Sequence, residues 1–273
     1  LYGSIFGYIM ILFNDVNNLQ KLDMKTFDDL RSLPKCEKFK SLRLKNLCFF
    51  YPQSKTNVIE DISFELKAGE SIGFIGASGS GKTTFLDTVL GLFVPQGGSI
   101  EFNGRILTKH LSEWRAQVAY IPQQVFLIDD SLRCNIALGV NENEIDNIKL
   151  DESIHRARLT NVVQTLPDGV ETIVGERGMR FSGGQCQRIA LARAFYHNRN
   201  VLIMDEATSA LDNETEQEIV NEIELLKGRV TIIVIAHNLK TLKHCDRIYE
   251  LQNGKIIGMG GYNEIIDLKA SQM

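Results

Sequence analysis

The sequence predicts an α/β protein with a parallel sheet covered by helices. Two segments, 200–207 (NVLIMDEA) and 230–237 (VTIIVIAH), are nearly all apolar until a polar end, which is the pattern of strands buried on both faces. A third apolar segment, 71–76 (SIGFIG), leads into a glycine-rich loop. The chain has 273 residues, of which 44% are hydrophobic and 23% charged, so it suits one large domain or two lobes.

The N-terminal residues 1–13 carry no charge. They are too few to cross a bilayer, which takes about 20 residues, and they lack the basic start and cleavage site of a signal peptide. The stretch alone is equally consistent with the end of a transmembrane helix and with a buried element of a soluble protein. Because the chain starts at Leu1, we expect a piece of a longer protein. Residues 14–40 have leucines at roughly helical spacing up to Pro34, and they predict a helix plus linker.

The rest of the chain alternates between strand and helix patterns. Further strands are predicted at 42–51, 61–70, 98–104 and 246–258, with a helix-rich middle at about 130–197. Within the last of these strand segments, Asn253-Gly254 predicts a hairpin turn.

The charge and the cysteines argue against two classes of protein. The net charge is −4 and no run of five basic residues occurs, so nucleic acid is not expected as a partner. The five cysteines show no metal-ligand or C-x-x-C spacing, which indicates free thiols in a reducing compartment.

A phosphate loop is predicted at 76–84, where GASGSGKTT fits the pattern G-x-x-x-x-G-K-S/T between a strand and a helical pattern over 82–93. Backbone N–H groups and the helix N-terminus can hold phosphate oxygens. We expect Lys82 to reach the β- and γ-phosphates of a nucleotide and Thr83 to bind Mg²⁺. The expected nucleotide-binding residues here are Gly76, Ala77, Ser78, Gly79, Ser80, Gly81, Lys82, Thr83 and Thr84.

Two acids, Asp205 and Glu206, end the strand at 200–207, on the edge where parallel sheets bind ligands. Asp205 can complete the Mg²⁺ shell. Glu206 points to the other side of the strand and is a candidate for polarising the attacking water. The alternative for Glu206 is an acid that caps the following helix.

A second phosphate-binding pattern lies at 181–194, FSGGQCQRIALARA, where a serine and two glycines precede a helical pattern. The run Phe181-Ser182-Gly183-Gly184-Gln185 resembles the signature motif of ATP-binding-cassette (ABC) ATPases, usually L-S-G-G-Q. In that family, two domains pair head to tail, and the signature of one closes on the ATP held by the other. The resemblance covers about residues 41–265, with the motifs in the family's order.

The resemblance implies a P-loop NTPase (RecA-like) core with a parallel sheet, an antiparallel β subdomain and a helical signature subdomain at about 128–197, within an ATPase domain at 41–273. It also implies roles for three residues that alone would be read as ordinary core or surface. Tyr51 matches the aromatic that stacks on adenine, Gln123 the glutamine that touches Mg²⁺ and water, and His237 the histidine that contacts the γ-phosphate. The loop that crosses the dimer interface matches Ser209, Ala210, Leu211 and Asp212.

Two further segments, 131–139 and 172–178 (TIVGERG), resemble exporter-type members, in which the ATPase follows six transmembrane helices on the same chain. This favours the end of a transmembrane helix at 1–13 and a linker at 14–40. The whole pattern resembles bacterial lipid and lipid-linked-oligosaccharide flippases, and peptide exporters share it.

Three positions depart from the family pattern. Phe181 replaces leucine, and Asn238 stands where arginine often follows the histidine. Cys186 stands where arginine or lysine is common, and its place near a helix N-terminus predicts a lowered thiol pKa.

The expected function is therefore Mg²⁺-dependent ATP hydrolysis that powers export or flipping of a lipid-like, lipid-linked-glycan or peptide substrate. Glu206 would act as general base, with His237 and Lys82 on the phosphates. The expected partners are a second copy in an ATP-dependent homodimer and a transmembrane domain on the same chain, at the cytoplasmic face of the cell membrane. Two alternatives are the ATPase subunit of an importer and a non-transport ABC ATPase.

Overall fold

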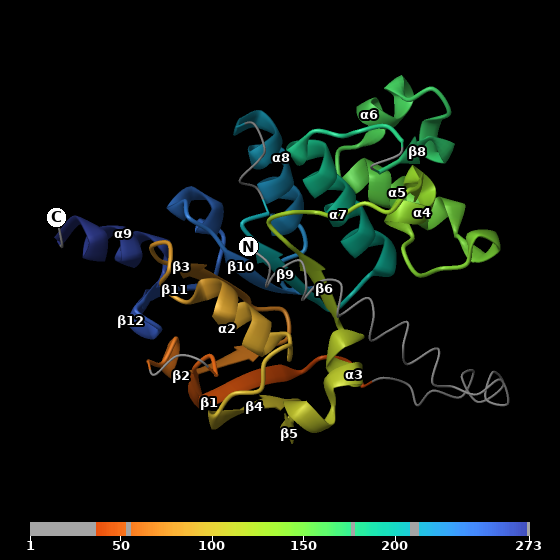
Figure 1. Ribbon diagram of the computed structural model, residues 1–273. Coiled ribbons are helices and arrows are strands. Elements are labelled where there is room, and N and C mark those ends of the chain that lie inside the picture. Colours follow the sequence, from red (N-terminus) through yellow and green to blue (C-terminus); the bar gives the residue numbers. More distant parts are fainter. Residues whose placement is uncertain (1–36, 53–55, 176–177, 208–212, 272–273) are drawn as a thin grey trace, which may run out of the picture.

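The computed structural model describes residues 37–52, 56–175, 178–207 and 213–271, which form two sheets and a group of helices (Figure 1). The expected membrane-helix end at 1–13, most of the helix and linker at 14–40, and the interface loop at 209–212 lie outside these residues. Among the helices that are described, none combines the length and the apolar character that crossing a bilayer requires.

The larger sheet has six strands in the order β12-β11-β3-β10-β9-β6. All neighbouring pairs are parallel except β11 with β12, so the predicted parallel sheet is confirmed. The three central strands β3, β10 and β9 are buried along their whole length, as their apolar runs predict. The strands are β3 (Ser71–Ile75), β6 (Val118–Ile121), β9 (Val201–Asp205), β10 (Thr231–Ile235), β11 (Arg247–Gln252) and β12 (Lys255–Gly260).

The turn between β11 and β12 is the predicted Asn-Gly hairpin. Asn253 has φ +49° and Gly254 has φ +77°, and left-handed conformations at both central residues are what the tightest hairpins require. The segment predicted as strand at 246–258 is therefore two antiparallel strands that form one edge of the sheet.

The smaller sheet is antiparallel, with the order β2-β1-β4-β5. One boundary differs from the sequence prediction at 61–70, because the strand ends at Lys67 and Gly69 (φ +81°) turns the chain into the larger sheet. Its strands are β1 (Ser41–Phe49), β2 (Ile59–Lys67), β4 (Gly97–Phe102) and β5 (Arg105–Ile106).

Helix α2 (Lys82–Val89) lies between the two sheets (Figure 1). Phe85 of this helix packs 4.6 Å from Phe74 of the larger sheet, measured between ring centroids, and also contacts Phe64 of the smaller one. The helix is shorter than the predicted 82–93, because Gly91 adopts φ +70° and ends it. The core between the sheets therefore fixes the start of α2, which carries the end of the phosphate loop.

On its other face, the larger sheet shares a second apolar core with the helical part of the chain. There α7 (Gly183–His197) contacts α4, α5 and β6. The remaining elements are α3 (Leu111–Arg115), β7 (Asp130–Ser131), α4 (Leu132–Ile136), α5 (Asn147–Arg156), α6 (Thr160–Thr165), β8 (Ile173–Val174), α8 (Asn213–Glu224) and α9 (Tyr262–Ser271). This arrangement gives the α/β fold that the sequence predicts, with an antiparallel sheet and a helical part added to a parallel core.

Candidate functional site

The phosphate loop connects β3 to α2 and depends on its glycines. Gly79 and Gly81 have φ values of +79° and +102°, which side chains rarely adopt. A Cβ atom on Gly76 would clash with the carbonyl oxygen of Leu251, and one on Gly81 would lie 2.8 Å from the carbonyl oxygen of Val58. The loop can therefore close only with glycine at the motif positions.

Lys82, the first residue of α2, bends back over this loop. Its ammonium group donates hydrogen bonds to the carbonyl oxygens of Gly76 at 2.8 Å and Ala77 at 3.0 Å. Burial lowers the pKa of Lys82, while Glu206 and Asp205 act in the opposite direction. A buried cation whose contacts are neutral carbonyls is well placed to accept the negative charge of a phosphate.

Asp205 is the last residue of β9 and is 5% exposed. Burial, reinforced by the adjacent Glu206, raises the pKa of Asp205 to about 6, against the effects of Tyr120 and Lys82. The hydroxyl of Tyr120, on the neighbouring strand β6, donates to Asp205 Oδ2 at 3.4 Å. A bound cation would relieve the unfavourable burial of this carboxylate.

Glu206 adopts φ +50°, an uncommon conformation for a residue with a side chain. This places its carboxylate between two segments that follow other strands. Oε2 accepts a hydrogen bond from Gln123 Nε2 at 2.7 Å, and Oε1 lies 2.5 Å from His237 Nε2. The carboxylate therefore contacts two side chains at the cavity, and its role as the general base stays a prediction.

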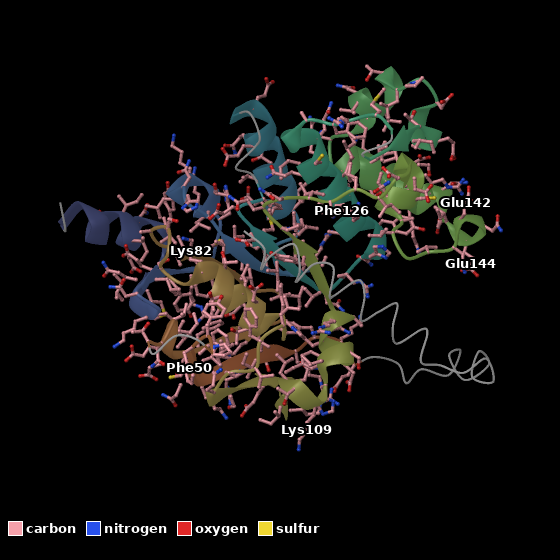
Figure 2. The ribbon with its side chains drawn as sticks, viewed as in Figure 1. Phe50, Lys82, Lys109, Phe126, Glu142 and Glu144 are labelled. Atoms are coloured by element: carbon pink, nitrogen blue, oxygen red, sulfur yellow. The ribbon has the colours of Figure 1, made fainter. Side chains whose placement is uncertain are left out.

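These residues surround one polar cavity of about 380 Å³ next to Lys82, which Figure 2 labels at the start of α2. Except for Val58, each residue that lines it was expected from sequence to contact the nucleotide or Mg²⁺ or, for Glu206, the attacking water. The lining residues are Val58, Ser78, Gly79, Gly81, Lys82, Thr83, Thr84, Gln123, Glu206 and His237. The carboxyl ends of β3, β9 and β10 thus meet at one site, as the parallel topology requires.

The donor set at this cavity fits Mg²⁺. Thr83 is exposed at the cavity and Gln123 also lines it, while the buried Asp205 is the chain neighbour of the lining residue Glu206. Mg²⁺ prefers oxygen ligands and is commonly held by one or two side chains together with phosphates. In the part of the chain that the structure describes, no group of three or more His, Cys, Asp or Glu side chains could hold a metal ion.

Tyr51 lies beside the phosphate loop rather than in the lining of the cavity. Its hydroxyl is 3.0 Å from Thr84 Oγ1, and its ring packs edge-on against Phe49 and Phe93. The ring remains 39% exposed. These contacts fix an aromatic surface within reach of the loop, and stacking on adenine stays a prediction.

The signature residues form the start of α7. Ser182 caps this helix: its Oγ accepts from the Gln185 backbone N–H at 3.3 Å, and Gln185 Oε1 accepts from the Ser182 N–H at 2.8 Å. Gly183 and Gly184 occupy the first turn, where backbone N–H groups are available to an anion. None of Ser182, Gly183, Gly184 or Gln185 lines the phosphate-loop cavity of the same chain.

The predicted lowered pKa of Cys186 is wrong. Burial raises the pKa of this thiol, and Arg193 and the helix backbone compensate only in part. The position near the helix N-terminus favours the thiolate, but packing against the core removes more solvation than the helix restores.

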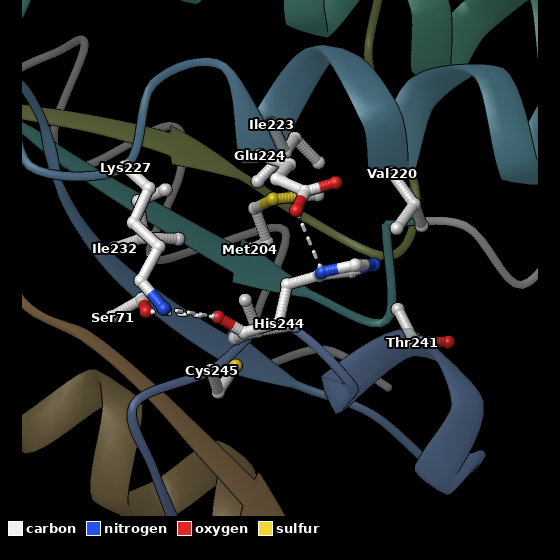
Figure 3. Close-up of a pocket in the computed structure, with 11 residues that line it drawn as sticks. Ser71, Met204, Val220, Ile223, Glu224, Lys227, Ile232, Thr241, His244 and Cys245 are labelled. Atoms are coloured by element: carbon white, nitrogen blue, oxygen red, sulfur yellow. Dashed lines mark hydrogen bonds and ion pairs between the residues drawn. The ribbon is translucent and has the colours of Figure 1, made fainter.

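A second cavity lies between α8 and the sheet, and Figure 3 shows it. It has a volume of about 30 Å³ and is lined mainly by apolar groups, among them Met204 and Ile232. The ion pair of Glu224 with His244, at 3.1 Å, closes one side. A gap this small, with a mainly apolar surface, does not form a catalytic site.

Sequence reasoning missed two residues that interact with Asp205. Tyr120 contacts Asp205 only because β6 pairs with β9 in parallel register, a long-range fact without a local signal. Asp87 of α2 is 4% exposed, and burial together with Asp205 raises its pKa to about 7. An acid inside the otherwise apolar helix pattern KTTFLDTVLGLF was the available signal.

Comparison with known proteins gives a consistent result. The family described as "ABC transporter" matches residues 59–209. Proteins named ATP-dependent lipid A-core flippase are 41% identical in Ralstonia nicotianae and 40% identical in Cupriavidus pinatubonensis, over 83% and 80% of this chain. The chain spans 38% and 37% of the length of these relatives. The solved structure of a bacterial Atm1-family ABC exporter with ATP bound superposes with a TM-score of 0.78 and 31% identity, over 87% of this chain and 42% of that one.

Proposed function

The chain belongs to the ABC transporter family, and we propose that it is the ATP-hydrolysing domain of an exporter. The observation that supports this best is the position of Glu206 at the edge of the phosphate-loop cavity, between Gln123 and His237. A carboxylate held there can accept a proton from water that attacks the γ-phosphate. The similarity to named flippases and to an exporter favours this function over an importer subunit or a non-transport ATPase.

In the proposed reaction, the loop amides and Lys82 hold the triphosphate. Thr83, Asp205 and Gln123 would hold Mg²⁺, which neutralises phosphate charge when bound with ATP. Glu206 takes the proton of the attacking water, and His237 steadies both Glu206 and the γ-phosphate. Burial raises the pKa of Asp205 and favours its protonated form, whereas a cation bound nearby would favour the ionised form.

The proposed partner is a second copy of this domain. Each chain carries a complete phosphate loop and a signature helix start that lies outside its own cavity, so two chains arranged head to tail would complete two sites. Nucleotide between the chains then stabilises the pair, and its hydrolysis releases them. We further propose a transmembrane domain on the same protein, at the cytoplasmic face of the cell membrane, and a lipid-like substrate, by analogy with the named flippases.

Glu206→Gln tests the proposal. The variant keeps the size of the side chain and one of its two acceptor oxygens but cannot accept the proton, so ATP hydrolysis should fall by about 10²–10⁴-fold. It should still bind MgATP and accumulate as an ATP-dependent dimer, which light scattering would detect. Glu144→Gln, an exposed glutamate remote from the cavity, is the control and should match the parent. Full hydrolysis by Glu206→Gln would disprove the role of the base.

A further inference from the structure

A buried arginine joins the signature helix to the segment that follows Gln123. Arg193 lies about three turns along α7 from the signature and is 7% exposed. Its guanidinium donates to the carbonyl oxygen of Asn135 at 2.6 Å, to Asn135 Oδ1 at 3.0 Å and to the carbonyl oxygen of Phe126 at 3.0 Å. Because burying a guanidinium is costly unless its N–H groups are satisfied, this geometry is strongly fixed.

Asn135 extends the contact to the next residues of the same segment. It is fully buried, and its Oδ1 also accepts from the Ile128 N–H at 2.9 Å. Its Nδ2 donates to the carbonyl oxygens of Ile128 at 3.0 Å, Ser131 at 3.1 Å and Asp130 at 3.4 Å. The segment 126–131 is therefore held against α7 by side chains rather than by regular secondary structure. We call Arg193, Asn135, Phe126 and Ile128 the Arg193 network.

The Arg193 network reaches Phe126, three residues after Gln123, the hydrogen-bond partner of Glu206. Gln123 precedes Phe126 by three residues, a span of about 10 Å at most, and Gln123 donates the 2.7 Å hydrogen bond to Glu206. Figure 2 labels Phe126 between the sheet and the helical part of the chain. A shift of α7 relative to the sheet would carry Phe126 with it and leave only Gln124 and Val125 to absorb the movement before Gln123.

We propose that Arg193, supported by Asn135, is a positioning residue that couples the signature helix to the contact between Gln123 and Glu206. The inference rests on the proposed ATPase function and adds a residue to it that touches neither nucleotide nor Mg²⁺. When the start of α7 moves onto a phosphate, the Arg193 network moves Gln123 and thereby frees or restrains the carboxylate of Glu206. The base is then active only when a signature helix is in place.

A double-mutant cycle in the full-length protein tests whether Arg193 acts through Gln123 or only packs the helix. Arg193→Lys keeps the charge but cannot bond three acceptors in the same fork. We expect kcat for ATP to fall about tenfold with KM changed by less than about twofold. In a Gln123→Ala background the same substitution should change kcat by less than about twofold, because the residue through which it acts is gone.

The matched control is Arg188→Lys on the same helix. Arg188 donates through Nη1 to the carbonyl oxygen of Arg158 at 3.1 Å, a contact with the segment that follows α5 rather than with the Gln123 segment. Its substitution removes a hydrogen bond of the same kind, and its effect on kcat should add to that of Gln123→Ala. If the effect of Arg193→Lys on kcat also added to that of Gln123→Ala, as expected for Arg188→Lys, the proposal would be overturned.

Hydrogen exchange gives a measurement that does not need hydrolysis. A non-hydrolysable ATP analogue should protect 76–84 in both the parent and Arg193→Lys, and should change exchange over 123–131 in the parent only. Loss of protection at 76–84 in the parent would count against the ATPase function itself. Protection there with the same response over 123–131 in both proteins would refute only the coupling.

Asn135→Ser covers the case in which Arg193→Lys does not fold. It removes the side-chain amide that bonds to Ile128. We expect the same loss of coupling to Gln123, with a smaller fall in kcat than for Arg193→Lys. If both variants unfold while Arg188→Lys stays folded, the Arg193 network is a folding element and the inference fails.

Discussion

The two segments that we propose to bind phosphate differ in what completes them. Gln123, Glu206 and His237 follow the ends of distant strands and, with the loop at 76–84, they enclose a cavity. The signature at Ser182 uses its hydroxyl to cap its own helix. Long-range sheet topology thus builds one half of the proposed site, whereas the other half is formed by a local helix cap.

Lys82→Ala should have the largest effect on the first segment. The ammonium group now bonds two loop carbonyls, and its removal leaves the phosphate without its cation. We expect MgATP affinity to fall by about 10–100-fold, measured by equilibrium binding of a fluorescent ATP analogue. Lys109→Ala, an exposed lysine away from the cavity, serves as control. Unchanged MgATP affinity in Lys82→Ala would mean that the loop binds the phosphates without the lysine.

Ser182→Ala should leave nucleotide binding intact and act on the second segment. Loss of the helix cap costs about 1 kcal/mol of stability, and loss of the hydroxyl at a partner's phosphate should slow hydrolysis by about tenfold. Thermal melting and steady-state ATPase assays separate the two effects.

Mixing chains makes the comparison sharper. A dimer of one Lys82→Ala chain and one Ser182→Ala chain has one site with neither substitution and one site with both. If the two segments serve each other's sites, the mixture should hydrolyse ATP faster than the mean of the two variants alone. A mixture no faster than that mean would show that each chain acts with its own signature.

The phosphate-loop region should also show the stronger pH dependence. Burial raises the pKa of Asp205 to about 6 and that of Asp87 to about 7, from an ordinary value of 3.8. The folded chain therefore binds more protons than the unfolded chain between about pH 4 and 7, and its stability falls as pH rises through this window. We expect the melting temperature without nucleotide to fall by about 5 °C from pH 5 to pH 8.

Asp87→Asn is the control for this pH effect, because it keeps the shape of the side chain and removes one titrating group. Its melting temperature should depend less on pH than that of the parent. A parent protein that is more stable at pH 8 than at pH 5 would contradict the assigned direction.

Much of this difference between the two segments could be predicted from sequence, for physical reasons. The phosphate loop and the strand at 200–207 have local patterns that fix strand, turn and helix. Parallel strands then bring their carboxyl ends together without further information. The Asn253-Gly254 turn follows from the left-handed conformations that only a few residues adopt readily.

The parts that sequence missed depend on burial or on distant partners. The left-handed conformation of Glu206, its contacts with Gln123 and His237, and the buried Arg193 network have no periodic signal. The predicted direction of the Cys186 thiol pKa was wrong, because the sequence shows that the residue lies near a helix start but does not show how deeply it is buried.

Alkylation of Cys186 should have the smallest effect and bears on the signature alone. Because burial raises its pKa, iodoacetamide should label it slowly at pH 7 and faster as pH rises. Its Sγ lies 4.0 Å from the carbonyl oxygen of Phe181, so an added group would press on the first turn of α7 and slow hydrolysis by about twofold to threefold. Cys186→Ala treated in the same way corrects for labelling of the other cysteines. Unchanged turnover after complete labelling at Cys186, confirmed by mass spectrometry, would mean that the start of α7 tolerates bulk and that the signature contacts lie on its other side.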